Sequence, residues 1–134
     1  MTDTATVQTL PDLKVGPITR TTLALFAGAS GDHNPMHIDI DAARAAGLDD
    51  VFGHGMLTMA HLGRMVTAWV PQERVREISG RFTAITPVLA SPTVSGRVVE
   101  VFTEDGEQRA RVELAVRLED GTETMRGSAV VSWP

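Results

Sequence analysis

The sequence predicts an α+β domain in which one long apolar helix lies against an antiparallel sheet. Residues 56–70 have helical periodicity, with apolar residues around much of the helix circumference. The second half of the chain changes to segments rich in Val and Thr, in which polar and apolar residues alternate in stretches. An antiparallel sheet must cover one of its faces, and only the helix at 56–70 is long and apolar enough to do so.

Length and composition limit the classes of protein to which the chain can belong. Its 134 residues are 43% hydrophobic and 22% charged, which is typical of one compact domain. The net charge of −5 argues against a general binder of nucleic acid or anionic membranes. The absence of cysteine excludes disulfides, thiolate catalysis and cysteine-ligated metals. The sequence shows no signal peptide and no apolar membrane span, so we expect a soluble, cytoplasmic protein.

The chain is expected to begin with an arm and a first strand. Residues 1–10 are rich in Thr and lack periodicity, which predicts a flexible N-terminal arm. Residues 11–134 should then form a single domain, with its first strand near 13–18. No internal repeat or second domain is evident in the sequence.

Two short helices are expected before the long one. Thr19 is suited to cap the first helix, which the polar cluster at 30–32 stops. Asp39 or Asp41 can cap the second, and Gly47 stands where a left-handed C-cap is preferred.

The long helix and the strands follow in order. Pro71 ends the helix because proline has no amide donor and disfavours helical geometry in the residue before it. Asp-Gly turns at 104–106 and 119–121 predict hairpins between the later strands. The four strands are expected at residues 76–85, 93–102, 109–118 and 124–133.

The residues with the clearest chemical potential lie just after the first short helix. Asp32 and His37 are five residues apart, and the intervening Asn34-Pro35 favours a turn that lets their side chains converge. A carboxylate beside an imidazole can hold one water and move its protons near neutral pH. Gly55, at the start of the long helix, lets a ligand approach unpaired backbone N–H groups, which can stabilise a developing oxyanion.

Two motifs give the chain a family resemblance. The string Ser-Gly-Asp-His-Asn-Pro-Met-His at 30–37 resembles the D-x-N-P-x-H signature of the MaoC-like or R-specific enoyl-CoA hydratase family. The string His-Gly-Met-Leu-Thr at 54–58 matches the second block of that family, in the expected order and separation. Within the family, the pattern is especially similar to the catalytic B subunit of the mycobacterial type II fatty-acid-synthase (3R)-hydroxyacyl dehydratase, over about residues 11–133.

This resemblance implies both a fold and an activity. The fold would be a hot dog, in which an antiparallel sheet wraps a long central helix, and two units would pair as a homodimer or as a heterodimer with a related subunit. The activity would be that of an (R)-specific hydratase/dehydratase, which interconverts trans-2-enoyl and (R)-3-hydroxyacyl thioesters of CoA or acyl carrier protein without a cofactor or metal. Asp32 and His37 would activate the water, the N–H of Gly55 would polarise the thioester carbonyl, and Asn34 would orient the loop or the aspartate.

The acyl chain is expected to lie along the buried helix, the most continuous apolar surface near the glycine turn. Many CoA-type hydratases carry a serine at the position that aligns with Ala60, and its absence favours the dehydratase subgroup. The residues predicted to bind the acyl chain are Leu57, Ala60, His61 and Met65.

Two other functions stay open from the sequence. A hot-dog thioesterase would bind similar substrates, but it usually places an acidic residue on the long helix, and residues 56–70 contain no Asp or Glu. A non-catalytic partner subunit would stabilise an active sister chain, but such chains tend to lack the acid or the histidine. This chain has both.

The histidines also allow structural interpretations. His33 and His37 could bind a metal together with Asp39 or Asp41, but Pro35 disrupts the helix that this spacing requires. His54 is more often expected to shape the glycine turn than to take part in catalysis. His61 is expected to be a satisfied core or interface histidine.

Overall fold

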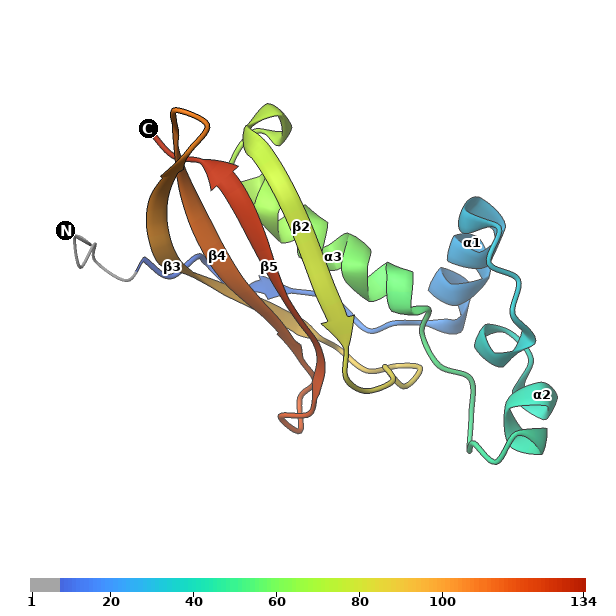
Figure 1. The fold of residues 1–134 in the computed structure, drawn as a ribbon. Helices are drawn as coiled ribbons and strands as arrows, with labels where there is room; N and C mark the ends of the chain where they lie inside the picture. Colours follow the sequence, from blue (N-terminus) through green and yellow to red (C-terminus); the bar gives the residue numbers. More distant parts are fainter. Residues whose placement is uncertain (1–7) are drawn as a thin grey trace.

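The computed structural model describes residues 8–134 and contains one five-stranded antiparallel sheet with the order β1-β3-β4-β5-β2 (Figure 1). The four strands expected in the second half are confirmed, although β2 ends three residues earlier than the pattern at 76–85 predicts. The chain leaves the sheet there, and the backbone N–H groups of Thr83 and Ala84 both donate to the carbonyl of Thr124. The strands are β1 (Leu13–Lys14), β2 (Val75–Phe82), β3 (Thr93–Glu104), β4 (Glu107–Arg117) and β5 (Glu123–Ser132).

Both predicted hairpin turns are present. Asp105 and Gly106 join β3 to β4 with φ angles of 51° and 75°, the left-handed conformation that a two-residue turn of this type requires. The β4–β5 connection passes through Gly121 at φ 88°. The two Asp-Gly dipeptides therefore place β3, β4 and β5 side by side.

The first strand is much shorter than the predicted segment at 13–18. Only Leu13 and Lys14 pair with β3, because Gly16 and Pro17 interrupt the ladder. Val15 and Ile18 still donate to carbonyls of the β2–β3 loop at 2.9 Å, so the segment stays attached to the sheet edge.

The predicted N-terminal arm falls partly outside the structure. Residues 1–7 lie outside the described residues. Residues 8–10 differ from the expectation of a flexible arm, because the carbonyl of Gln8 accepts a hydrogen bond from β3 and Leu10 is only 4% exposed. An apolar side chain at this position makes the segment part of the core, a packing role that the absence of periodicity in the sequence does not reveal.

The helices follow the predicted order. Thr19 caps α1 with its side chain, Gly31 ends it in a left-handed conformation, and Asp39 caps α2. The long helix α3 begins one residue before the predicted start and ends at Trp69, before Pro71. The elements are α1 (Arg20–Ser30), η1 (Pro35–His37), α2 (Ile40–Ala45), α3 (Gly55–Trp69) and η2 (Gln72–Arg74).

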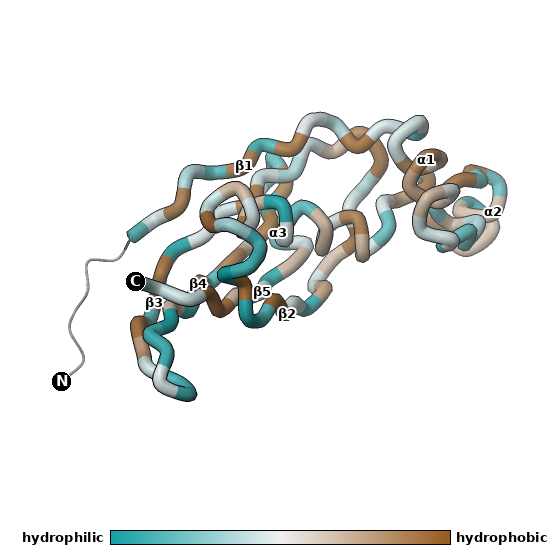
Figure 2. Tube along the Cα trace, turned by 90° about the horizontal axis from the view of Figure 1, so that it is seen from above, coloured by the Kyte–Doolittle hydropathy of each residue, from teal (hydrophilic) through white to brown (hydrophobic). Residues whose placement is uncertain are grey.

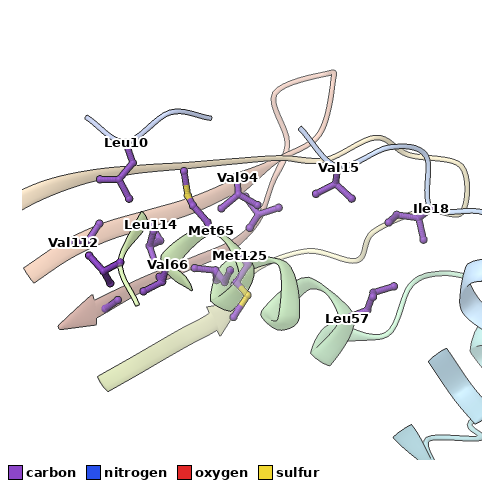
Figure 3. Close-up of a cluster of buried hydrophobic side chains, with 14 of the residues drawn as sticks. Leu10, Val15, Ile18, Leu57, Met65, Val66, Val94, Val112, Leu114 and Met125 are labelled. Carbon is purple, nitrogen blue, oxygen red and sulfur yellow. The ribbon is translucent and has the colours of Figure 1, made fainter. Parts of the chain in front are cut away.

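The helix α3 packs on one face of the sheet, as the sequence predicts. Viewed from above, it lies between the segment that carries β1 and the strands β5 and β2 (Figure 2). Its buried face is formed by Leu57, Thr58, Leu62, Met65 and Val66. The four apolar members of this set meet apolar residues of the strands and of the N-terminal segment in one continuous core (Figure 3).

Glycines in the sheet allow this close packing. Gly96, Gly127 and Gly80 lie in one row across β3, β5 and β2, with Leu114 between the first two. A Cβ atom at Gly127 would collide with the backbone oxygen of Ser79, and one at Gly80 would collide with Met125. Positions 80 and 127 of the row therefore need glycine.

The segment with the predicted catalytic residues lies outside the sheet. The helices α1 and α2 project beyond the N-terminal end of α3 (Figure 1). A bidentate ion pair between Arg20 and Asp50, with N–O distances of 2.9 and 2.6 Å, joins the start of α1 to the loop before α3. Among residues 8–134, no helix is both long and apolar enough to cross a membrane.

Candidate active site

A tight turn brings Asp32 and His37 together. Gly31 reverses the chain after α1 with φ 77°, and Pro35 opens the short helix η1. The side chain of Asn34 accepts a hydrogen bond from the N–H of Met36 at 3.1 Å and so caps η1. The backbone N–H of Asn34 donates to Oδ1 of Asp32 at 3.2 Å. The turn therefore orients the Asp32 carboxylate through the backbone of Asn34.

His37 is held in one orientation and one tautomer. Its ring is buried, and Nδ1 lies 2.7 Å from the carbonyl oxygen of Phe52. A carbonyl oxygen can only accept, so Nδ1 must carry the proton. The neutral ring therefore presents an unprotonated Nε2.

The free Nε2 of His37 faces the carboxylate of Asp32. The distance from Nε2 to Oδ2 is 3.9 Å, longer than a direct hydrogen bond. The Asp32 side chain is 48% exposed, so water reaches it, while the imidazole is 92% covered. Two acceptors at this separation suit a single water that donates one hydrogen bond to each.

His54 packs against this pair. Its ring stacks on His37 with centroids 4.0 Å apart and packs edge-on against Phe26 at 4.8 Å. Nε2 of His54 lies 3.2 Å from the backbone carbonyl oxygen of Asp32. Burial lowers the pKa of His54, and the neighbouring His37 lowers it further.

Gly55 begins α3 directly after His54. Its backbone N–H is among those at a helix start that have no acceptor within the helix. It lines a groove of about 330 Å³ with Phe52, Phe82 and Ile85. A Cβ atom at position 55 would stand 3.2 Å from the Phe82 ring, so glycine keeps this approach open.

Three of these groups also meet the distance requirement for a metal site. One ligand atom from each of Asp32, His37 and His54 lies within 4.8 Å of the others. The two imidazoles are stacked at an interplanar angle of 27° with centroids 4.0 Å apart, however, so their in-plane lone pairs lie in nearly parallel, separate planes. Zn–N bonds of about 2.0–2.1 Å need lone pairs that converge on one ion. The arrangement suits proton transfer better than coordination.

The sequence of this site matches a known family of domains. The family described as "MaoC like domain" matches residues 3–122. The chain belongs to the MaoC-like family. This confirms the resemblance drawn from the two motifs at 30–37 and 54–58.

Two curated relatives match parts of this MaoC-like chain. The mitochondrial 3-hydroxyacyl-[acyl-carrier-protein] dehydratase of Arabidopsis thaliana is 36% identical over 66 residues, which cover 44% of this chain and 40% of that protein. The peroxisomal multifunctional enzyme type 2 of Mus musculus is 29% identical over 121 residues, 90% of this chain and 16% of that protein. The chain thus spans less than half of the length of either relative.

Solved structures share the fold of the MaoC-like chain. R-hydratase PhaJ1 from Pseudomonas aeruginosa has a TM-score of 0.83 at 25% identity, covering 96% of this chain and 81% of that one. The ChsH1–ChsH2 complex from Mycobacterium tuberculosis has a TM-score of 0.80 at 25% identity, with 98% and 100% covered. The HadBC (3R-hydroxyacyl-ACP dehydratase) complex of the same organism, at 11% identity and a TM-score of 0.71, shares the fold, covering 99% of this chain and 100% of that one. The predicted hot-dog fold is confirmed.

The residues predicted to line an acyl site divide among three places in the MaoC-like domain. Leu57 and His61 line a narrow apolar cavity beside His54, closed on its other sides by residues such as Ile18 and Val116. Met65 lines a separate groove under the N-terminal segment. Ala60 is on the exposed side of α3 and lines neither of these. The structure therefore brings Leu57 and His61 together and leaves Ala60 apart from them.

Two residues of the candidate site were not predicted from the sequence. The carbonyl of Phe52 fixes His37 across fifteen residues of chain, and Phe26 packs against His54. Neither has a local signal, because a backbone acceptor and an edge-on aromatic contact depend on the tertiary fold. The sequence shows only that Phe52 belongs to the same short stretch as His54 and Gly55.

Proposed function

We propose that the chain is an (R)-specific hydratase/dehydratase that interconverts trans-2-enoyl and (R)-3-hydroxyacyl thioesters. The observation that best supports this function is the 3.9 Å separation of His37 Nε2 from Asp32 Oδ2, with Nδ1 of His37 already committed to Phe52. The MaoC-like family and the names of two relatives, a hydratase and a dehydratase, point to the same chemistry.

In the proposed reaction, Asp32 and His37 hold one water through its two hydrogens. The water oxygen adds to C3 of the enoyl thioester while one of its protons passes to the pair. The electrons of the double bond move toward the thioester carbonyl, and the proton returns to C2. One H and one OH are thus added, and dehydration is the reverse.

In this proposal, the start of α3 stabilises the negative charge that develops on the thioester oxygen. The backbone N–H of Gly55 would donate to the thioester oxygen, where the positive end of the helix dipole also stabilises charge. The groove beside it gives the thioester a place to lie, since it is lined by Phe82, Ile85 and Thr86. Leu57 and His61 would face the first carbons of the acyl chain.

The alternatives have less support from the same residues. A thioesterase of this fold would use an acid on the long helix, and Gly55–Trp69 contains none. A non-catalytic subunit does not need a His37 ring fixed in one tautomer opposite a carboxylate. A cytoplasmic location stays a prediction, and the name of the A. thaliana relative describes a mitochondrial protein.

The proposed partners are an enoyl thioester of CoA or acyl carrier protein and a second hot-dog subunit. Met56, Phe82 and Ile85 are at least half exposed although they are apolar. They surround the start of α3, near the end of the edge strand β2. A second subunit, identical or related, would cover them.

A direct assay tests the proposed function. Purified protein is mixed with crotonyl-CoA, the loss of the conjugated double bond is followed by absorbance, and the product is resolved by chirality. The proposal predicts hydration to the (R)-3-hydroxy product. Release of free CoA without hydration would support the thioesterase, and inactivity both alone and with a related subunit would support a structural role.

A further inference from the structure

His54 contacts both proposed catalytic side chains and precedes the proposed oxyanion donor. Its Nε2 meets the backbone oxygen of Asp32 at 3.2 Å, and its ring face covers His37 at 4.0 Å. Gly55 is the next residue in the chain. His54 is only 1% exposed, so solvent reaches it poorly, although it lines the narrow cavity with Leu57 and His61.

The hydrogen bonds give the two stacked rings opposite tautomers. The carbonyl of Asp32 can only accept, so Nε2 of His54 carries the proton and Nδ1 does not. In His37 the proton is on Nδ1, which donates to Phe52. Nδ1 of His54 has no hydrogen-bond partner among residues 8–134. A bare lone pair there is favoured by the positive end of the α3 dipole.

We propose that His54 is a positioning residue, a neutral Nε2–H imidazole that sets the backbone of Asp32 with its hydrogen bond and the ring of His37 with its face. This inference rests on the proposed function of Asp32 and His37, and it assigns His54 no proton transfer. Loss of the donor should free the turn at Asp32, whereas loss of the ring should let the His37 imidazole tilt.

The surroundings keep His54 neutral. The groups that face it are His37 from η1, Asp32 from the loop after α1, and the uncharged ring of Phe26 from α1. Burial is the main cause of its lowered pKa, and the Asp32 contacts oppose it only in part. A positive charge on His54 would stand 4.0 Å from the His37 ring and weaken its ability to accept a proton.

Three substitutions separate the two contacts. His54→Phe keeps a ring face but removes the donor, His54→Gln keeps a donor but removes the ring, and His54→Ala removes both. We expect kcat to fall about 100-fold in the alanine variant and less in the other two, because small misplacements of reacting groups are costly. KM should change by less than about 3-fold, since the hydrogen bond and the ring contact of His54 go to Asp32 and His37. The matched controls are His33→Phe and His33→Gln, because His33 is exposed beside Asp32.

The melting temperature of each variant shows whether it folds. If the alanine variant does not fold, the Phe and Gln variants still test the proposal. Turnover within about 2-fold of wild type in both folded Phe and Gln variants would overturn the proposal. An equal loss in the His33 controls would also overturn it, because the effect would then be general to the loop.

An NMR measurement does not depend on activity. Long-range ¹H–¹⁵N spectra of the wild-type protein should show His54 as the Nε2–H tautomer and His37 as the Nδ1–H tautomer at neutral pH. An Nδ1–H or protonated His54 under these conditions would refute the inference. A wild-type protein with both tautomers as described but no hydratase activity would instead refute the proposed function alone.

Discussion

Nε2 of His37 lies 3.9 Å from Oδ2 of Asp32, and the two atoms make no direct hydrogen bond. The ring cannot turn to close this gap without giving up its hydrogen bond to Phe52. The carboxylate is similarly held through Oδ1 by the N–H of Asn34. Two fixed acceptors that do not satisfy each other are left to share a donor, and at 3.9 Å one water could donate a hydrogen to each.

The glycine row beneath α3 gives a prediction about stability. Gly127→Ala places a Cβ against the backbone oxygen of Ser79, which cannot move without breaking the β2–β5 pairing. We expect the free energy of unfolding to fall by about 1–3 kcal/mol, measured by urea denaturation. In the control Gly28→Ala, on exposed helix α1 with open space around it, stability should rise by about 0.5–1 kcal/mol. A neutral Gly127→Ala would show that the β2–β5 contact at Ser79 has room for a Cβ atom.

The Arg20–Asp50 pair predicts a dependence of stability on acid pH. Hydrogen bonding to Arg20 lowers the pKa of Asp50 from 3.8 to about 2. A carboxylate whose pKa is lowered on folding stabilises the fold at pH values above its pKa in the unfolded chain. This contribution is lost as the pH falls from about 4 to about 2. Asp50→Asn should therefore lower the melting temperature at about pH 6 and make little difference near pH 2. A difference that does not change with pH would contradict the ion-pair explanation.

The fold could be predicted from the sequence where local signals agreed with tertiary packing. The helix at 56–70 and the turn at Asp105-Gly106 each have a chemical cause that acts within a few residues. The first strand was predicted too long because its pairing stops at Gly16-Pro17. Leu10 was missed because its burial depends on β3, which lies more than eighty residues later.

The candidate site, like the fold, could be predicted where its geometry depends on residues close together in the sequence. The turn around Asn34-Pro35 brings Asp32 toward His37 as expected. The carbonyl of Phe52 and the ring of His54 could not be placed in the same way, because both arrive from the segment before α3 after it has folded back. Ala60 was grouped with Leu57 by apolar character, although the helix turns it to the exposed side.

The narrow cavity beside His54 encloses only about 10 Å³, so an acyl chain that enters it must displace its walls, and its lining predicts where chain length is sensed. Leu57 is 9% exposed and lines this cavity, so Leu57→Phe should reduce the space for the acyl chain. We expect activity on an eight-carbon enoyl-CoA to fall about 10-fold more than activity on crotonyl-CoA, as steady-state kinetics would show. Ala60→Phe should not discriminate in this way. Equal losses on both substrates, or shortening by the Ala60 change alone, would place the acyl chain elsewhere.

The exposed apolar surface at the start of α3 predicts an oligomer. Light scattering should give about twice the 14.4 kDa of one chain for a homodimer, or a complex when a related subunit is added. Met56 is 60% exposed, and Met56→Asp should weaken this association while the helix start tolerates the negative charge. Leu25→Asp is the control, since Leu25 is 69% exposed on α1. A stable, active monomer would contradict the prediction.

Two histidines whose pKa is lowered in the fold, His54 and the half-buried His61, predict a loss of stability on mild acidification. Burial lowers the pKa of His54 and of His61 below the ordinary 6.5. The unfolded chain therefore binds more protons than the folded one as the pH falls below about 6.5, and the free energy of unfolding decreases. His54→Phe should reduce the difference in stability between about pH 7.5 and about pH 5.5, measured by urea denaturation. An unchanged difference would show that folding does not lower the pKa of His54.

The most direct test of the shared water is a double-mutant cycle on Asp32 and His37, with kcat measured on crotonyl-CoA. Asp32→Asn keeps the shape of the side chain but removes its basicity, and His37→Ala removes the imidazole. Each should lower kcat by about 10²- to 10⁴-fold with little change in KM, and the double mutant should be scarcely worse than the poorer single mutant, because the two groups act on one water. His33→Ala, with its exposed side chain, should keep most activity. Near-normal turnover in Asp32→Asn, or fully additive losses in the double mutant, would contradict a water held jointly by Asp32 and His37.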